Sequence, residues 1–289
     1  MFKCIHAAAF FLLTSTATMA IDLTPLWDFA DPQVSEQRFR AALATAVGDD
    51  ALILQTQIAR TCGLRKEFEK AREVLKAIEP KVASAGPEAR TRFALELGRS
   101  HASATHPASS QTVETKELAR AAFNKALDTA HAAGLDGLAI DAIHMLAFVD
   151  TAPADQLKWA QEALAVVDRS TQPAAKRWEP SIRNNIGYAL HQLGRYDEAL
   201  VQFKQAVELR ERGTDAEATR VAHWMVAWTL RALKRSDEAL AIQLRLEREG
   251  EAAGQPDPYV FEELELLYRD KGNEERARHY AERKASARK

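Results

Sequence analysis

Apolar and small residues recur every three or four positions along most of the chain, which is the spacing of one face of an α-helix. The clearest segment runs from Asn184 to Leu209 and reads NNIGYALHQLGRYDEALVQFKQAVEL. Its apolar and small positions form two sets: Ile186, Gly187 and Leu190, then Ala199, Phe203 and Ala206. Between the sets, Leu193-Gly194-Arg195 interrupts the pattern. The segment therefore predicts two antiparallel helices joined by a tight turn.

Small residues mark where the two predicted helices approach each other most closely. Gly187 in the first helix and Ala199 in the second leave room for the opposite backbone. A bulky replacement at Ala199 should therefore cost on the order of 1–3 kcal/mol through overpacking.

The two-helix pattern repeats along the chain, which favours a stack of similar modules over a single closed core. Equivalent anchors of the second helix are separated by 37, 43 and 40 residues, at Ala126, Ala163, Ala206 and Leu246. About six such units would cover residues 51–289. Alternating polar and apolar positions, typical of strands, are scarce, so the fold should be all-α.

At these positions the chain resembles the tetratricopeptide repeat, whose pattern is Trp-x2-Leu-Gly-x2-Tyr followed by Ala-x3-Phe. Ile186-Gly187 stands where the family has Leu-Gly, Ala199 and Phe203 match, and Leu190 replaces the Tyr. The units are longer than the family's 34 residues, as in its longer-helix variants. The resemblance implies a right-handed α-solenoid of antiparallel helix pairs, in which the first helix of each pair lines a concave groove.

The first 50 residues lie outside the repeats. Residues 1–20 place Lys3 before the apolar run from Ile5 to Leu13 and end in small residues at Ala20, which is the order of a cleaved signal peptide. This predicts an exported protein, most simply a periplasmic one, with no membrane span in the mature chain because no later stretch reaches 18 apolar residues. Residues 21–50 contain SEQRFRAALATA, which predicts a capping helix that starts near Ser35.

Composition excludes several functional classes. The 289 residues carry 39 basic and 41 acidic side chains, a formal charge of −2, so no global field favours nucleic acid. Removal of Cys4 with the signal peptide would leave Cys62 as the one thiol, expected to be buried and inert, and no intrachain disulfide.

Catalytic chemistry has no visible motif. No phosphate loop, dinucleotide fingerprint, nucleophile elbow or zinc-protease helix occurs, and the histidines are dispersed. His101 and His106 are expected to lie exposed on one loop, without ligands at metal-binding spacing. We therefore expect a protein that is not an enzyme and that needs no cofactor or metal.

Helix geometry indicates a binding face. Each residue turns an α-helix by 100°, so residue numbers identify the side of each first helix that points away from its partner helix. In three of the units this side carries aromatic, polar and charged residues: Asp141, Met145, Asn184, Tyr188, His191, Trp224, Trp228 and Arg231. The indoles would supply contact area, with Asp141, Asn184 and Arg231 setting the orientation of a ligand. The competing interpretation is that Trp224 and Trp228 fill gaps between hairpins, and for Trp159 and Trp178 packing is favoured.

Three functions fit this arrangement. The first is a scaffold that binds a peptide or partner protein through its concave groove. The second is a structural subunit of an envelope assembly, and the third is a sensor of a small molecule or peptide signal.

Overall fold

Helical hairpins build almost the whole of the computed structural model, which describes residues 21–287. The proposed signal peptide lies outside the described residues. Each hairpin pairs two consecutive antiparallel helices: α2 (Gly48–Leu64) with α3 (Phe68–Val82), α4 (Pro87–His101) with α5 (Val113–Ala132), α6 (Asp136–Val149) with α7 (Pro153–Arg169), α9 (Glu179–Gln192) with α10 (Tyr196–Glu211), α11 (Ala216–Ala232) with α12 (Ser236–Ala252), and α13 (Pro258–Asp270) with α14 (Glu274–Ala287).

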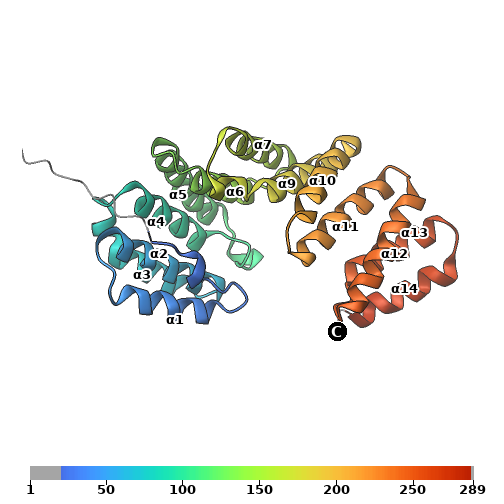
Figure 1. The fold of residues 1–289 in the computed structure, drawn as a ribbon, viewed down its shortest axis with the longest axis horizontal. Coiled ribbons are helices and arrows are strands. Elements are labelled where there is room, and N and C mark those ends of the chain that lie inside the picture. The colour runs from blue at the N-terminus through green and yellow to red at the C-terminus, as the bar shows by residue number, and fades with distance from the viewer. Residues whose placement is uncertain (1–20, 288–289) are drawn as a thin grey trace, which may run out of the picture.

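The remaining elements are short or terminal: η1 (Thr24–Leu26), α1 (Pro32–Leu43), η2 (Ala108–Ser110) and α8 (Pro173–Lys176). The ribbon forms an arch in which α1 to α5 occupy one end, α11 to α14 the other, and α6, α7, α9 and α10 the span between them (Figure 1). No strand occurs in residues 21–287, and the prediction of an all-α solenoid of antiparallel helix pairs is confirmed. None of the described helices is both long enough and apolar enough to cross a membrane.

Four of the six turns within the hairpins share one backbone conformation, a residue with positive φ after the first helix. Gly194 has φ of +73°, and the N–H of Arg195 donates to the carbonyl of Leu190 at 2.9 Å. This arrangement satisfies a carbonyl at the helix end and reverses the chain in a few residues. Lys234 holds the equivalent position after α11 at φ of +61°, which shows that the turn geometry is kept even without glycine.

Glycine permits the close approach of the two helices in two hairpins. A Cβ added to Gly187 in α9 would lie 2.7 Å from the ring of Phe203 in α10. A Cβ added to Gly98 in α4 would lie 2.4 Å from the ring of Phe123 in α5. Both phenylalanines are fully buried, so in both hairpins a glycine of the first helix packs against a phenylalanine of the second.

The buried apolar residues form three clusters along the arch instead of one central core. The first joins α1 to α4 and includes Phe39 and Phe93, the second extends from Ala94 in α4 to Leu267 in α13, and the third holds α12, α13 and α14 together around Leu264. Each module therefore depends mainly on its neighbours, as expected of a repeat protein.

The N-terminal helix starts earlier than the sequence predicts. Asp31 is the N-cap of α1, because its carboxylate accepts from the N–H groups of Gln33 and Val34. Ser35, the predicted start, is fully buried, and its hydroxyl accepts from the N–H of Asp28 and donates to the carbonyl of Asp28. The serine thus anchors the preceding segment against the helix.

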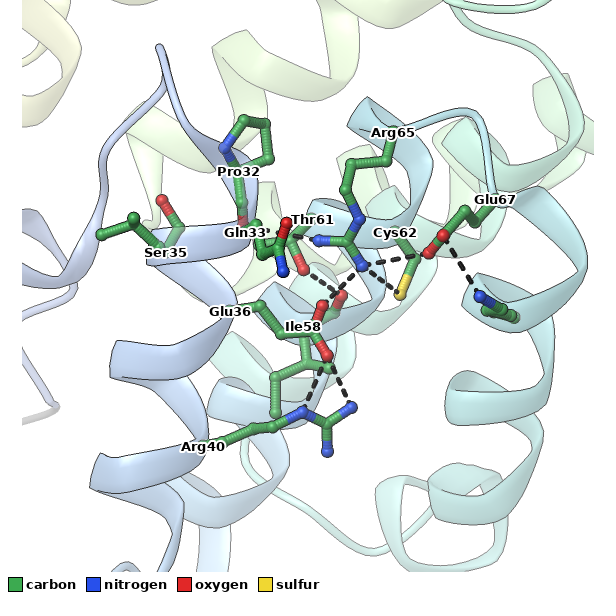
Figure 2. Close-up of polar contacts among 12 residues, drawn as sticks. Pro32, Gln33, Ser35, Glu36, Arg40, Ile58, Thr61, Cys62, Arg65 and Glu67 are labelled. Carbon is green, nitrogen blue, oxygen red and sulfur yellow. Dashed lines mark hydrogen bonds and ion pairs between the residues drawn. The ribbon is translucent and has the colours of Figure 1, made fainter.

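An arginine at the end of α2 joins α1 to the first hairpin (Figure 2). Arg65 Nη2 contacts Glu36 Oε2 at 2.5 Å and Glu67 Oε2 at 3.0 Å. Burial raises the pKa of Glu36, but the hydrogen bonds from Arg40 and Arg65 outweigh burial and bring that pKa below its usual value. Cys62 is buried beside this network, and burial raises the pKa of its thiol.

Candidate functional site

Aromatic side chains from three successive hairpins contact one another in a continuous row. Trp224 and Trp228 lie one turn apart on α11, with ring centroids 5.7 Å apart. Trp228 stacks on Tyr188 of α9 at 6.0 Å, and Trp224 meets the edge of Tyr259 of α13 at 6.4 Å. His191 of α9 stacks on Trp228 at 3.3 Å. These five residues, Tyr188, His191, Trp224, Trp228 and Tyr259, are called the aromatic ladder below.

The two ends of the aromatic ladder face solvent. Tyr188 is 41% exposed and Tyr259 is 60% exposed, whereas the two indoles between them are partly covered by stacking. An exposed row of rings that bridges three hairpins is an apolar surface with polar tips, the chemistry that recurs in protein binding sites.

His191 is uncharged in this row at neutral pH. Burial of the ring, together with the positive charge of Arg231, lowers the pKa of His191 to about 4. The Nε2 atom is buried and has no hydrogen-bond partner among residues 21–287. His191 therefore extends the apolar face of the aromatic ladder instead of adding a charge.

Trp224 has a structural role as well as a place in the aromatic ladder. It packs against the third core cluster, which contains Leu246 and Leu264, and its indole N–H is buried without a partner among the described residues. The packing interpretation of this indole therefore holds in part. Tyr188 and Tyr259 are more exposed, so their replacement should disturb the core less.

Arg231 is not free to orient a ligand, contrary to the expectation from the sequence. Its guanidinium makes two hydrogen bonds to the carboxylate of Glu263 on α13, at 2.8 and 2.9 Å. These bonds and the negative charge of Glu263 raise the pKa of Arg231. The ion pair joins two adjacent hairpins beside the aromatic ladder, and the positive charge of Arg231 is balanced by the negative charge of Glu263.

Asp141 and Met145 lie elsewhere, and this is a second difference from the expected groove. Both are buried and line a cavity of about 270 Å³ formed mainly by α2, α4 and α6. Asp141 is paired with Arg99. Asn184 lines another opening of about 360 Å³, between α9, α10 and α11. The structure thus brings together Tyr188, His191, Trp224, Trp228 and Arg231 and separates the other three predicted residues from them.

The comparisons with known proteins agree with the fold. The family model described as the tetratricopeptide repeat matches residues 178–247, which contain α9, α10, α11 and most of α12. The chain therefore contains tetratricopeptide repeats. No curated protein matches its sequence.

Solved structures resemble this repeat protein over most of its length at low sequence identity. A signal-transduction ATPase from Pyrococcus horikoshii with a tetratricopeptide-repeat sensor has a TM-score of 0.68 and 13% identity, covering 88% of this chain and 38% of that chain. Apo RapI has a TM-score of 0.61 and 12% identity, covering 82% and 97%. NprR in complex with its cognate peptide NprX has a TM-score of 0.56 and 13% identity, covering 92% and 76%. At these low identities, the structural similarity shows that the chains share a fold.

Two site residues of this tetratricopeptide-repeat protein were missed from the sequence, although the signal was present. Tyr259 and Glu263 lie 35 residues after Trp224 and Trp228 and occupy the equivalent positions of the last hairpin. Extending the same helix rotation by one module identifies both. Tyr259 keeps the aromatic character of Trp224, whereas Glu263 has a carboxylate where Trp228 has an indole.

The expectation that His101 and His106 lie exposed on one loop is wrong. His101 ends α4, and His106 is buried, with its ring stacked on Phe68 at a centroid distance of 3.5 Å. His106 Nδ1 lies 2.9 Å from the hydroxyl of Ser103, and Nε2 lies 3.2 Å from the carbonyl of Ser100. The ring thus closes the loop onto α3 and α4. Within residues 21–287, no group of three potential ligands is placed to hold a metal ion.

Proposed function

We propose that this tetratricopeptide-repeat protein is an exported, non-catalytic scaffold that binds a peptide or protein segment along the aromatic ladder. The observation that carries the proposal is the unbroken contact of Tyr188, Trp228, Trp224 and Tyr259 across three hairpins, with exposed rings at both ends. Similar folds include NprR, whose structure holds a cognate peptide.

The chemistry of the aromatic ladder indicates what such a segment contains. Rigid rings bury large areas with few torsions to order, so they favour apolar or aromatic anchor side chains in the ligand. His191 is uncharged and the charge of Arg231 is paired with Glu263, so neither residue offers a free charge to a ligand. We therefore expect recognition dominated by apolar contact, with the polar tips of Tyr188 and Tyr259 fixing the direction of the segment.

The test uses the exposed ends of the aromatic ladder, because neither ring is part of the buried core. Peptides selected from a random library on the mature protein are titrated against the wild type and against the double variant Tyr188→Ala/Tyr259→Ala. We expect an affinity loss of at least tenfold, with unchanged helical content by circular dichroism.

The matched control is Phe29→Ala, which removes another exposed ring, 63% accessible, at the far end of the arch. This variant should bind the selected peptides like the wild type. Equal affinity of the double variant and the wild type would refute the aromatic ladder as the binding face. So would an equal loss in the Phe29 variant.

Export is the part of the proposal that rests on residues 1–20 alone. Fractionation of the source cells followed by N-terminal sequencing tests it. Processing after Ala20 predicts a mature chain that begins at Ile21. An unprocessed chain in the cytosolic fraction would contradict it.

A further inference from the structure

A second candidate site lies in the N-terminal half, in the cavity of about 270 Å³ that α2, α4 and α6 enclose. The cavity is lined by both charged and apolar side chains. The charged residues are Arg60, Glu96, Arg99 and Asp141, and the apolar residues include Met145, Phe148 and Trp178. None of these residues belongs to the aromatic ladder.

Arg99 is fully engaged in this cluster. Its Nη1 donates to Glu96 Oε1 at 2.6 Å, and its Nη2 donates to Asp141 Oδ1. Burial raises the pKa of Asp141, but the charges of Arg99 and Arg60 outweigh burial and hold that pKa below its usual value. Asp141 is therefore ionised and already paired at neutral pH.

Arg60 and Glu96 keep unused hydrogen-bonding capacity. The Arg60 side chain is 28% exposed and makes no hydrogen bond within residues 21–287, and its nearest carboxylate oxygen is Glu96 Oε1 at 3.7 Å. Its guanidinium lies over the rings of Trp27 and Phe29, 5.5 and 5.9 Å from their centroids. Glu96 is 3% exposed, and its Oε2 has no partner. A buried carboxylate oxygen without a partner is costly, and a ligand that donates to Glu96 Oε2 while it accepts from the N–H groups of Arg60 would relieve that cost.

The charge balance restricts the kind of ligand. Two arginines face two carboxylates, and His144 beside them is uncharged at neutral pH, because burial lowers its pKa. A ligand with one net charge would leave the cluster unbalanced, whereas a ligand with one positive and one negative group preserves the balance. An α-amino acid carries both groups on one carbon, a separation that suits charges 3.7 Å apart.

The volume of the cavity and its apolar lining residues agree with a small ligand. The volume lies below the roughly 300–1,000 Å³ of pockets that hold drug-sized molecules. Met145 is a flexible apolar residue that adapts to different shapes, and the Trp178 indole offers a flat face. An apolar side chain of modest size would pack against these residues.

We propose that this cavity binds a free α-amino acid with an apolar side chain, its carboxylate on Arg60, its ammonium group on Glu96, and its side chain against Met145, Phe148 and Trp178. The site shares no residue with the aromatic ladder, so either site can fail in experiment without the other. Binding there would draw α2, α4 and α6 together.

Calorimetric titration of the mature protein tests the proposal with L-leucine, L-methionine and L-phenylalanine as probes. The controls are N-acetyl-L-phenylalanine, which lacks the ammonium group, and L-phenylalaninamide, which lacks the carboxylate. We expect at least one free amino acid to bind and each blocked form to bind at least tenfold more weakly. Absence of binding by all three free amino acids at millimolar concentration would overturn the proposal, as would equal binding of either blocked form.

The variant Arg60→Gln should weaken binding of the free amino acid at least tenfold and remove the discrimination against the amide. Arg60 contacts Glu96 at 3.7 Å and lies over the rings of Trp27 and Phe29, so circular dichroism must show that the variant is folded before its affinity is compared. The matched control is Arg92→Gln on α4, which removes an arginine of similar exposure that pairs with Glu88 and lies outside this cavity. If Arg60→Gln unfolds, Glu96→Gln takes its place and should remove the discrimination against the N-acetyl form. An unchanged affinity in the folded variant would overturn the assignment.

Discussion

Replacement of Gly187 by alanine tests the packing argument for the hairpins in its most direct form. The new Cβ would lie 2.7, 2.8 and 2.9 Å from three atoms of the Phe203 ring, closer than real Cβ contacts allow. Because Phe203 is fully buried, its ring has no free volume into which it could move.

Two opposing terms set the size of the effect. Alanine gains about 1 kcal/mol over glycine in a helix interior through its better helix propensity. Overpacking of a filled core costs about 1–3 kcal/mol, and contact with three atoms of a fully buried ring places this case in the upper part of that range. We therefore expect Gly187→Ala to lower the free energy of unfolding by about 1–2 kcal/mol.

Urea denaturation followed by circular dichroism measures this difference. The matched control is Gly63→Ala near the end of α2, where no atom lies within 4 Å of the added Cβ and alanine should be neutral or stabilising. In a Phe203→Leu background the same Gly187 substitution should cost much less, because the ring atoms that it meets are gone. A Gly187→Ala variant as stable as the wild type, with Phe203 present, would refute the reasoning.

Two further predictions concern buried polar groups. Gln243 is fully buried on α12, and neither its amide nitrogen nor its amide oxygen has a partner among the described residues, so Gln243→Met should raise the free energy of unfolding by about 1–2 kcal/mol in urea denaturation. A less stable variant would show that the amide is satisfied after all. The pKa of His191 falls from its usual 6.5 to about 4 in the folded chain, so the unfolded chain binds more protons between these values and stability decreases as the pH falls through this window. His191→Phe, which keeps a ring on Trp228, should make the decrease in the denaturation midpoint shallower, and parallel pH profiles would contradict this assignment.

The fold could be predicted from the sequence because helix period and small residues are local signals. The pattern around Gly187 and Phe203 places both on the shared face of one hairpin, and the structure puts them in contact. The start of α1 was less predictable. Asp31 and Ser35 are both common helix-start residues, and the choice between them depends on the bonds of Ser35 to Asp28 in the folded segment.

The candidate sites were predictable only in part. Rotation along each first helix identifies Tyr188 and Trp228 because position on a helix face follows from residue number. Pairing between hairpins does not follow in this way. The partners of Asp141 and Arg231 are Arg99 and Glu263, 42 and 32 residues away, so neither ion pair nor the cavity beside Arg60 is visible in the local pattern.

The division of the apolar interior has a consequence for how this protein tolerates change. The cavity is walled by helices of the first two clusters, whereas the aromatic ladder is supported by the second and third. A substitution that loosens α13 should leave the surroundings of Arg60 unchanged, since α13 packs against α11, α12 and α14. The two candidate sites can therefore be altered separately, by substitutions in different hairpins of the arch.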